Sequence, residues 1–521
     1  MKRLACIILI VTILVGGLFL VKTTHATTVS GLLNVDTHWT QNDSPINLNG
    51  TVTVNSNVTL TIDPGVTVNL GMYGLFVSGT LNATGDASNG IMFIASSIYN
   101  FTTNVNAPIF FYSSSTQWND DSSNGSIIQN ANLNQIYIQI TSASPKICNC
   151  QFNFQTPYQS TISVNGGSPI ISNCIIVYNS QGSQGYTGSS YCVNIYGGAP
   201  KITNNQFEGT YANYSSSEIK VNSGTPTITN NLFDGDYQGS NNNGISISSG
   251  NPIISDNKFK GNGYLTAIVD SSSAQFTISN NLFSNCNSGI TAQSTSALTV
   301  SNNSFLNGND GINILGSASL TIAGNLIDGN SRFGISGGGY IDSNTITNNK
   351  VGIHNPPSGT ISNNNIVGNT LNSIDATTTN VNAQNNWWGT TDVPTINQTI
   401  YDSKVDRSLG TITFVPFLNQ PSPTAPVIPA TAPIITPIPT QIGTLQTTQT
   451  IQIPIDTLTP TINQYSQTFI YQIGSIFNLN MVVSSTALIL VFVWLIVILG
   501  YGAKKGISKL RSTNEKQNKK S

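Results

Sequence analysis

The amino-acid sequence predicts an all-β protein built around a right-handed parallel β-helix, a solenoid, with a transmembrane α-helix near its C-terminus. The first observation is a short phrase that occurs eleven times between Pro145 and Trp388, with 19 to 31 residues from one copy to the next. The second is composition, because the units are rich in Asn, Gly, Ser, Thr and β-branched residues and lack helical periodicity. Units of this size bury their apolar face only against neighbouring units, which is the packing of a solenoid.

The first 26 residues are expected to be a secretory signal peptide. Lys2 and Arg3 precede an apolar run over residues 4–21, and small residues follow up to Ala26. This order of charged, apolar and small residues is typical of a cleaved signal. The apolar run approaches the length of a membrane span, so an uncleaved anchor is the alternative.

Residues 27–140 are predicted to form an N-terminal cap and the first β-helix coils, and residues 141–388 the β-helix repeats. The copy at 199–207 reads APKITNNQF. The β-branched residue before the Asn pair suits a strand, because branching at Cβ fits a pleated surface. These residues should stack inside the solenoid, and the aromatic or aliphatic residue that ends the phrase should form a second interior column. The first column comprises Ile147, Ile171, Ile202, Ile228, Ile254, Ile278, Val300, Ile322, Ile341 and Ile361. The second comprises Phe152, Ile176, Phe207, Phe233, Phe259, Phe283, Phe305, Ile327, Ile346, Ile366 and Trp388.

The recurring asparagines are predicted to stack as a ladder. An Asn at a turn tolerates left-handed backbone angles, and its amide can hydrogen-bond to the coils above and below. The predicted ladder comprises Asn205, Asn231, Asn257, Asn281, Asn303, Asn325, Asn344, Asn364 and Asn386. Cys150 and Cys174 hold the same position in the first two units. Because stacked strands lie about 4.8 Å apart, these two cysteines could form a disulfide; two buried thiols are the alternative.

With these repeats the chain resembles the secreted right-handed parallel β-helix repeat proteins of archaea and bacteria. Residues 59–68 (TLTIDPGVTV) and 75–83 (LFVSGTLNA) are similar to the opening coils of that family, and residues 385–390 (NNWWGT) with 410–417 (GTITFVPF) to its closing segment. The resemblance covers about residues 29–418 and implies a closing segment over residues 389–419. It implies an architecture and no particular activity, since this fold carries lyases, hydrolases and adhesins.

Three further segments are predicted after the solenoid. Residues 420–480 are rich in Pro, Thr, Gln and Ile without periodicity, which is typical of an extended stalk. Residues 481–502 contain no charged residue and are predicted to be the transmembrane helix. Residues 503–521 form a basic tail with seven Lys and Arg against one Glu, a net charge of 7 − 1 = +6. Because positive flanking charge stays in the cytoplasm, the repeats should be extracellular.

The predicted outer part has an acidic balance that argues against nucleic acid as a partner. Residues 27–480 contain nine Lys and Arg and twenty Asp and Glu, a net charge of 9 − 20 = −11. Nucleic-acid binding depends on neutralising phosphates with basic side chains, so this composition disfavours it.

Long connections after several early units provide a candidate binding face. Insertions at one position of a stack project from one side of it, and tyrosine offers sugars or a protein partner a flat surface with a hydroxyl group. The predicted binding residues are Tyr178, Tyr186, Tyr191, Tyr211, Tyr214 and Tyr237. The alternative is that these tyrosines pack the loops onto the solenoid.

Candidate catalytic carboxylates are Glu208, Asp234 and Asp236, with Lys260 one coil further along. Stacking would bring Glu208 and Asp234 to about 5 Å, which is near the separation used by retaining glycosidases. A solvated pair that Lys260 offsets is the alternative. The residues demand no cofactor, and calcium held by these three carboxylates is the metal that their chemistry would suit.

The sequence therefore predicts a single-pass membrane-anchored cell-surface protein with extracellular repeats and a cytoplasmic C-terminus. Recognition, adhesion or envelope structure is the expected role, with a glycan or another surface protein as partner. The alternative is an extracellular carbohydrate-active enzyme, either a polysaccharide lyase or a glycoside hydrolase, that uses Glu208, Asp234 and Asp236.

Overall fold

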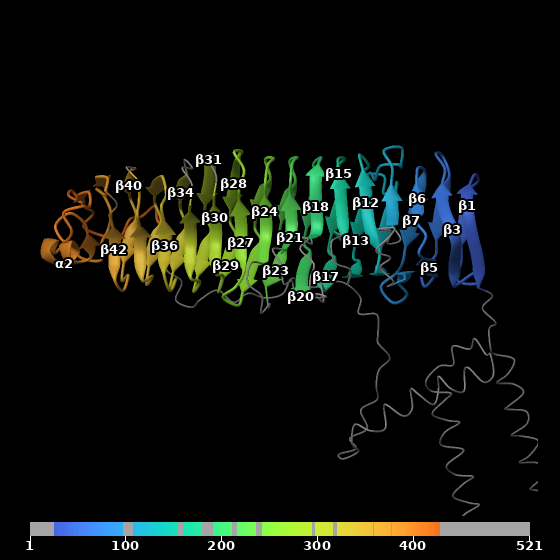
Figure 1. The fold of residues 1–521 in the computed structure, drawn as a ribbon, viewed down its shortest axis with the longest axis horizontal. Helices are drawn as coiled ribbons and strands as arrows, with labels where there is room; N and C mark the ends of the chain where they lie inside the picture. Colours follow the sequence, from blue (N-terminus) through green and yellow to red (C-terminus); the bar gives the residue numbers. More distant parts are fainter. Residues whose placement is uncertain are drawn as a thin grey trace, which may run out of the picture. The chain divides into compact units, whose positions relative to one another are not determined.

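A computed structural model of the chain describes residues 26–96, 108–154, 160–179, 191–210, 216–235, 242–293, 297–315, 320–357, 359–376 and 378–427. These residues form a solenoid of parallel strands, as Figure 1 shows. The predicted signal peptide up to residue 25, most of the predicted stalk, the transmembrane segment and the basic tail lie outside the described residues. Among the described residues, no helix has the length and apolar character needed to cross a membrane.

Each coil contributes up to three strands, which we call a, b and c in chain order. The a strands form a 14-stranded parallel sheet, here sheet a, that runs the length of the solenoid. Its strands are β2 (Thr37–Trp39), β4 (Thr59–Ile62), β7 (Thr80–Thr84), β10 (Ile127–Gln129), β13 (Lys146–Cys148), β16 (Ile170–Ser172), β19 (Lys201–Thr203), β22 (Thr227–Thr229), β25 (Ile253–Ser255), β28 (Gln275–Ser279), β31 (Ala297–Ser301), β34 (Thr321–Ala323), β37 (Tyr340–Asp342) and β40 (Ile361–Ser362).

The b and c strands form the other two faces, which join through β3 (Ile46–Val54) because this long strand pairs with one strand of each. Sheet b comprises β5 (Thr67–Gly71), β8 (Ile91–Ala95), β11 (Ala131–Asn134), β14 (Gln151–Phe154), β17 (Ile175–Asn179), β20 (Gln206–Thr210), β23 (Leu232–Gly235), β26 (Lys258–Gly261), β29 (Leu282–Ser284), β32 (Ser304–Leu306), β35 (Leu326–Asp328), β38 (Thr345–Thr347) and β41 (Asn365–Val367). Sheet c comprises β6 (Leu75–Val77), β9 (Pro108–Phe111), β12 (Tyr137–Thr141), β15 (Ile162–Asn165), β18 (Tyr191–Gly197), β21 (Ser216–Val221), β24 (Asn242–Ile247), β27 (Thr266–Asp270), β30 (Ser288–Ala292), β33 (Asp310–Ile314), β36 (Phe333–Ser336), β39 (Val351–His354), β42 (Asn372–Asp375) and β44 (Ile400–Tyr401).

The two ends of the solenoid differ from its regular coils. At the N-terminal end, β1 (Thr27–Leu33) pairs with β3, so residues 27–140 enter the coil pattern from their first strand. At the other end, the short helix α2 (Val393–Gln398) precedes β44, and β43 (Val381–Asn382) pairs with β45 (Ile412–Thr413). Asp392 caps α2 by accepting a hydrogen bond from the backbone N–H of Thr395.

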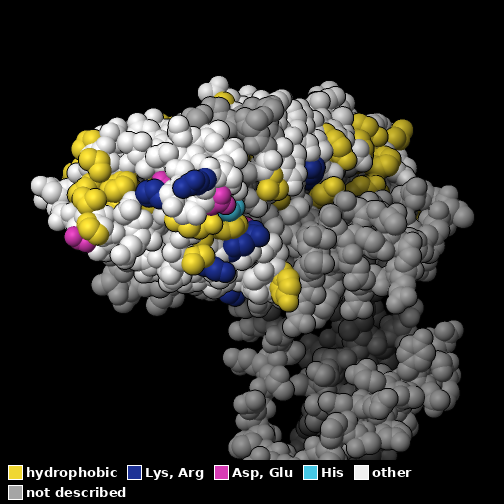
Figure 2. All heavy atoms as spheres, turned by 60° about the vertical axis from the view of Figure 1, so that its left-hand side comes forward, with side chains coloured by type: hydrophobic (Ala, Val, Ile, Leu, Met, Phe, Trp, Pro, Cys, Tyr) yellow, Lys and Arg dark blue, Asp and Glu magenta, His cyan; other side chains and the backbone are white. Residues whose placement is uncertain are grey.

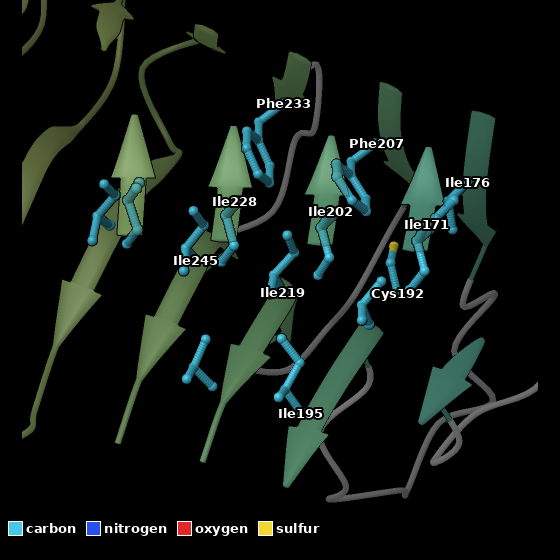
Figure 3. Packing of buried hydrophobic residues seen from close by; sticks show 14 of the residues in the cluster. Ile171, Ile176, Cys192, Ile195, Ile202, Phe207, Ile219, Ile228, Phe233 and Ile245 are labelled. Atoms are coloured by element: carbon cyan, nitrogen blue, oxygen red, sulfur yellow. The ribbon is translucent and has the colours of Figure 1, made fainter. Parts of the chain in front are cut away.

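Two columns of apolar side chains fill the interior. Ile202 of β19 and Ile228 of β22 are paired neighbours with no exposed surface. In sheet b, the rings of Phe207, Phe233, Phe259, Phe283 and Phe305 stack with centroids 4.5–5.0 Å apart and nearly parallel planes. Figure 3 shows these columns meeting the isoleucines of sheet c in one interior. The solenoid part of the predicted fold class is therefore confirmed.

A ladder of buried asparagines lies at the corner between sheets a and b. Asn257 shows the pattern, because its Oδ1 accepts from both the backbone N–H and the side-chain amide of Asn231 at 2.9 and 3.0 Å. Its own amide donates to the carbonyl of Ile228 in the preceding coil at 2.9 Å. The same bonds run from Asn205 to Asn386, and the backbone N–H of Cys174 donates to Asn205 at the start. Each ladder side chain thus ties three successive coils together.

Two adjacent residues share the roles at this corner: one adopts the left-handed backbone conformation, and the next makes the hydrogen bonds along the stack. This differs from the sequence-based expectation that a single Asn does both. The residue before each ladder Asn adopts the left-handed conformation, with φ of 57° at both Asn204 and Asn230 and 59° at Asp256. The ladder Asn follows it and makes the bonds along the stack. Asn is frequent at both positions for different reasons, since one needs a tolerated positive φ and the other needs a donor and an acceptor.

A second asparagine ladder, which the sequence reasoning missed, occupies the corner between sheets b and c near the C-terminal end. Asn330 donates its side-chain amide to Oδ1 of Asn349 at 2.8 Å, and Asn349 donates to Asn369 at 3.1 Å. Gly329, Asn348 and Gly368 precede these residues with positive φ. Asparagine ladders therefore connect the coils at two corners of the solenoid. Its sequence signal is an Asn five residues after the first-ladder residues Asn325, Asn344 and Asn364.

Loss of one ladder side chain should destabilise the solenoid strongly. Asn257→Ala removes the acceptor of two Asn231 donors and the donor to the carbonyl of Ile228, all of which are buried. We expect the free energy of unfolding to fall by about 2–4 kcal/mol, since unsatisfied buried groups cost more than the average hydrogen bond contributes. Chemical denaturation followed by circular dichroism measures this loss.

The matched control is Asn230→Gly, one coil earlier at the exposed left-handed position. Glycine adopts a positive φ without strain, so this change should alter the free energy of unfolding by less than about 0.5 kcal/mol. Equal losses for Asn257→Ala and Asn230→Gly would show that the side-chain ladder contributes no specific stability.

Candidate functional site

The paired carboxylates predicted from the sequence lie on the outer face of sheet b. Glu208 of β20 and Asp234 of β23 are direct partners in the strand register, and Lys260 follows Asp234 in β26. Lys260 binds both carboxylate oxygens of Asp234 at 3.2 Å, while Glu208 accepts a hydrogen bond from Gln206. Glu208 and Asp234 are therefore adjacent, as expected, and Asp234 forms an ion pair with Lys260.

The rest of this predicted site cannot be placed. Asp236, Tyr186, Tyr211, Tyr214 and Tyr237 lie outside the described residues, and only the backbone of Tyr178 is described, within β17. Tyr191 begins β18, where it is partly buried and pairs in register with Ser217. In the part of the chain that the structure describes, no cluster of three or more His, Cys, Asp or Glu side chains could hold a metal ion.

The cysteines of the first two repeats are free thiols in the structure, which is the second of the two alternatives that the sequence left open. Cys150 donates through Sγ to the carbonyl of Ile128 at 3.5 Å, and Cys174 to the carbonyl of Ile147 at 3.8 Å. These carbonyls occupy the place of those that receive the asparagine amides further along the stack. Each thiol therefore makes the hydrogen bond to the preceding coil that the side-chain NH₂ of a ladder Asn makes, as a weaker donor.

Glu218 is a buried carboxyl inside the solenoid that the sequence analysis overlooked. It lies in β21 in a register column otherwise made of small residues, between Cys192 of β18 and Gly244 of β24. Its side chain is buried, and Oε2 has no hydrogen-bond partner among the described residues. Burial, with a smaller contribution from the charge of Asp234, raises the pKa of Glu218 to about 8. The carboxyl is therefore mostly protonated at neutral pH.

A continuous row of outward-facing side chains follows sheet c, one per coil, and we call it the outer row. Each member follows an inward-facing residue of its strand, and most members lie between two such residues. The row comprises Thr53, Phe76, Phe110, Gln139, Ser163, Asn194, Lys220, Ser246, Val269, Thr291, Asn313, Ser336, His354, Asp375 and Tyr401. Its central members are almost all hydrogen-bonding side chains, whereas aromatic rings lie toward both ends.

The N-terminal end of the outer row carries an aromatic cluster. The rings of Phe76 and Phe110 meet edge to face with centroids 5.8 Å apart, and Tyr112 lies 4.5 Å from Phe110. Tyr112 remains exposed. Edge-to-face packing of this kind stabilises the cluster beyond the apolar area that it buries.

The C-terminal end carries a denser cluster, which we call the Arg–Phe–His cluster after Arg332, Phe333 and His354. The rings of Phe333 and His354 stack in parallel at 4.1 Å. Arg332 lies 4.9 Å from the Phe333 ring and binds Asp310 of the preceding coil through two nitrogens. Because Arg332 reaches back one coil and His354 comes from the next, the Phe333 ring lies between them.

Hydrogen bonds fix the orientation of the His354 ring. Nδ1 contacts both oxygens of Asp375, at 2.8 and 2.9 Å, and the amide nitrogen of Asn355 lies 3.0 Å from Nε2. With Nδ1 donating to Asp375, Nε2 of a neutral ring accepts from Asn355. Figure 2 shows Lys and Arg side chains close to Asp, Glu and His side chains on the face of the molecule that it draws. Charged, aromatic and hydrogen-bonding groups are thus all present in one partly exposed patch.

The sequence analysis did not identify Arg332, Phe333 and His354 as a cluster. The repeating phrase fixes the register of sheets a and b, whereas Arg332, Phe333 and His354 lie at the start and end of c strands. The available signal was the spacing of apolar pairs such as Gly334-Ile335 and Gly352-Ile353, which aligns the two c strands.

Comparison with known protein families supports the handedness of the solenoid. A family model described as "Right handed beta helix region" matches residues 191–351 and residues 266–388. The matched regions run from β18 past β41, and the solenoid is a right-handed parallel β-helix. No curated protein and no solved structure matches the chain.

The buried carboxyl predicts a pH-dependent stability. The folded state binds the Glu218 proton more tightly than the unfolded chain, whose ordinary pKa is 4.5. The stabilising effect is complete below about pH 4.5 and is lost as the pH rises toward 8, at up to about 1.4 kcal/mol per pH unit. Glu218→Gln should flatten this decline in urea-unfolding experiments between pH 5 and 8.5.

Glu208→Gln, which removes an outward-facing carboxylate from the neighbouring strand β20, is the matched control. It should retain the decline in stability with pH. An unchanged slope in Glu218→Gln would mean that Glu218 does not hold the proton.

Proposed function

We propose that the protein is a membrane-anchored cell-surface rod that recognises a glycan along the outer row of sheet c. The observation that carries this proposal is the row itself, because it presents hydrogen-bonding side chains at most coil steps of about 4.8 Å and aromatic rings toward its ends. Aromatic faces and edges suit the apolar faces of sugar rings, while Gln, Asn, Ser and Thr suit their hydroxyl groups.

The charge balance favours a neutral glycan over an acidic one. Residues 27–480 have a net charge of 9 − 20 = −11, which repels polyanions at long range. The cations near the outer row are already engaged in part, since Arg332 binds Asp310. A neutral chain would meet no such repulsion, and its hydroxyl groups could replace water along the row.

Anchoring at the membrane is part of the proposal. Residues 481–502 provide an uncharged apolar stretch long enough for one span, and the +6 tail after it favours a cytoplasmic C-terminus. The Pro-rich stretch before it would hold the solenoid away from the lipid surface as a spacer.

The enzyme alternative retains a specific observation, namely the adjacency of Glu208 and Asp234. Retaining glycosidases need one carboxylate as acid and one as nucleophile. Here Lys260 bonds to both oxygens of Asp234, so this carboxylate is already engaged in an ion pair with its neighbour. Binding without cleavage therefore accounts better for these contacts.

A glycan array probed with the purified full-length chain tests the proposal. We expect binding to neutral oligosaccharides, and Phe333→Ala should weaken it about five- to ten-fold by removing the ring between Arg332 and His354. Tyr340→Ala is the matched control, because Tyr340 is an exposed aromatic on sheet a. It should leave the affinity unchanged.

Reducing-sugar and unsaturated-product assays on every bound glycan separate the two functions. Bound sugars that stay intact support recognition, whereas cleavage that Glu208→Gln abolishes would establish the enzyme. Equal affinities for Phe333→Ala and Tyr340→Ala would remove the Arg–Phe–His cluster, at the C-terminal end of the outer row, from the binding face.

A further inference from the structure

The chain contains nine Asn-x-Ser/Thr sequons, and most of them lie in its first coils. Six of the 14 asparagines in residues 27–126 begin a sequon, against three of the 46 asparagines in residues 127–418. A high Asn content alone therefore does not explain the sequons of the first coils. A sequon is the acceptor signal for N-glycosylation of a secreted chain. The nine acceptor residues are Asn42, Asn49, Asn57, Asn82, Asn100, Asn124, Asn213, Asn302 and Asn397.

The sequon of Asn49 projects from the corner between sheets b and c. The pairing of β1 with β3 passes directly from Leu48 to Val52, and β5 and β6 pair with β3 only before and after residues 49–51. Asn49 and Thr51 are both exposed. Neither side chain makes a hydrogen bond with another residue that the structure describes. Both groups of this acceptor signal are therefore accessible.

The sequon of Asn57 lies in the turn between β3 and β4. Asn57 has a φ of 64°, and Val58 closes the turn by donating its backbone N–H to the carbonyl of Asn55 at 3.1 Å. Asn57 is exposed and Thr59 is half-buried, and in the described part of the chain neither side chain is hydrogen-bonded. Turn tips are the places where a folded chain admits a modifying enzyme most readily.

The fold hinders the other five sequons that lie within the described residues. Asn82 shows this most clearly, because its Oδ1 accepts from the hydroxyl of Thr84 at 2.8 Å within β7, a strand that is paired on both sides. In the remaining four, either the hydroxyl group is hydrogen-bonded or the middle residue is buried. These groups are the hydroxyls of Ser44, Ser126 and Thr399 and the buried ladder residue Asn303.

The two accessible sequons lie beside the open end of the solenoid. β1 pairs with β3 on one side, and its other edge has no partner strand among the described residues, as Figure 1 shows at that end. Leu32 and Val35 are 63% and 73% exposed there. Residues 27–35 contain no charge and no proline, which are common protections of an edge strand against pairing with another chain. This edge therefore needs protection of another kind.

Both sequons are in contact with the first strand or with the residues just after it. A Cβ on Gly50, in the middle of the first sequon, would lie 2.9 Å from the Cβ of Ser30 in β1. Asn55, two residues before the second acceptor, donates its side-chain amide to Oδ1 of Asn34, which follows β1. Groups attached to the two acceptor residues would therefore flank the open edge at two of its corners.

We propose that Asn49 and Asn57 are N-glycosylated and that their glycans shield the open edge of β1 from other chains. The proposal rests on the extracellular location of the repeats, which is part of the proposed function. A glycan is bulky and hydrophilic, so two of them beside the edge would keep a second strand from reaching its free N–H and C=O groups.

The modification requires a lipid-linked oligosaccharide as the sugar donor. The side-chain nitrogen of each Asn forms a C–N bond with the anomeric carbon of the donor. The bond from that carbon to the lipid phosphate breaks, and the phosphate leaves with the electron pair. A base of the transferase takes one proton from the amide nitrogen.

Mass spectrometry of glycopeptides tests the sites in the full-length protein purified from the cells that naturally produce it. We expect a sugar mass on Asn49 and on Asn57 and none on Asn82. Thr51→Ala should remove the modification of Asn49, whereas Thr51→Ser should retain it, because the sequon needs a hydroxyl group. Unmodified Asn49 and Asn57 would overturn the proposal. Equal occupancy of Asn82 would also overturn it, because access in the folded solenoid would then not select the sites.

A membrane-impermeant, amine-reactive biotin reagent added to intact cells distinguishes this proposal from the proposed function. It should label exposed lysines of the solenoid such as Lys201. Labelling together with unmodified Asn49 and Asn57 would overturn the glycosylation alone. A solenoid that is neither labelled nor modified would overturn both the extracellular location and the glycosylation.

Sedimentation analysis tests the shield. The variant with both Asn49→Gln and Asn57→Gln should show a mass that rises with concentration toward about twice that of the monomer, since an unprotected edge pairs with a second edge. Asn82→Gln is the matched control and should stay monomeric. Adding Leu32→Lys and Val35→Lys to the double variant should restore the monomer, and circular dichroism checks that each variant is folded. A folded double variant that stays monomeric would overturn the proposed shield.

Discussion

The asparagine ladder at the corner between sheets a and b is the constraint on which the rest of the solenoid depends. Each ladder side chain accepts from the coil before it and donates to the carbonyl of that coil, so a coil can join only if its corner repeats the same geometry. Because these groups are buried, a missing partner costs more than an average hydrogen bond contributes. The register of this corner then fixes the a strands before it and the b strands after it, including the stacked phenylalanines.

The three outer faces share this scaffold and differ in chemistry. Sheet a exposes scattered side chains such as Ile253 and Tyr340, and sheet b carries leucines that are almost completely buried. Sheet c presents the polar outer row with its aromatic ends. Inward-facing positions pack into the same apolar interior in all three sheets. Outward-facing positions lack that constraint, so their chemistry can differ from one sheet to another. Different faces of one rod can therefore bind different partners.

The sequence predicts the interior better than the surface, and the reason is periodicity. Ile228, Phe233 and Asn231 recur because every coil needs the same inward groups, so one chain contains many copies of the signal. Arg332, Phe333 and His354 occur once and come together through a register that only the c strands set. Glu218 has a similar explanation, because it interrupts a column of small residues that no short motif identifies. Asp236 and most of the predicted tyrosines lie outside the described residues, so that part of the predicted site stays a prediction.

The bonds that Asn231 makes with Asn205 and Asn257 are nearly identical on its two sides, and the same holds for the next members of the ladder. Any ladder residue could therefore meet a neighbour two coils away equally well if the coil between were deleted in frame. Duplication or deletion of one unit of the gene would then lengthen or shorten the molecule by a single step and leave the asparagine ladder continuous. Such a protein can serve as a molecular ruler, whose reach evolves through unit number and without redesign of any contact.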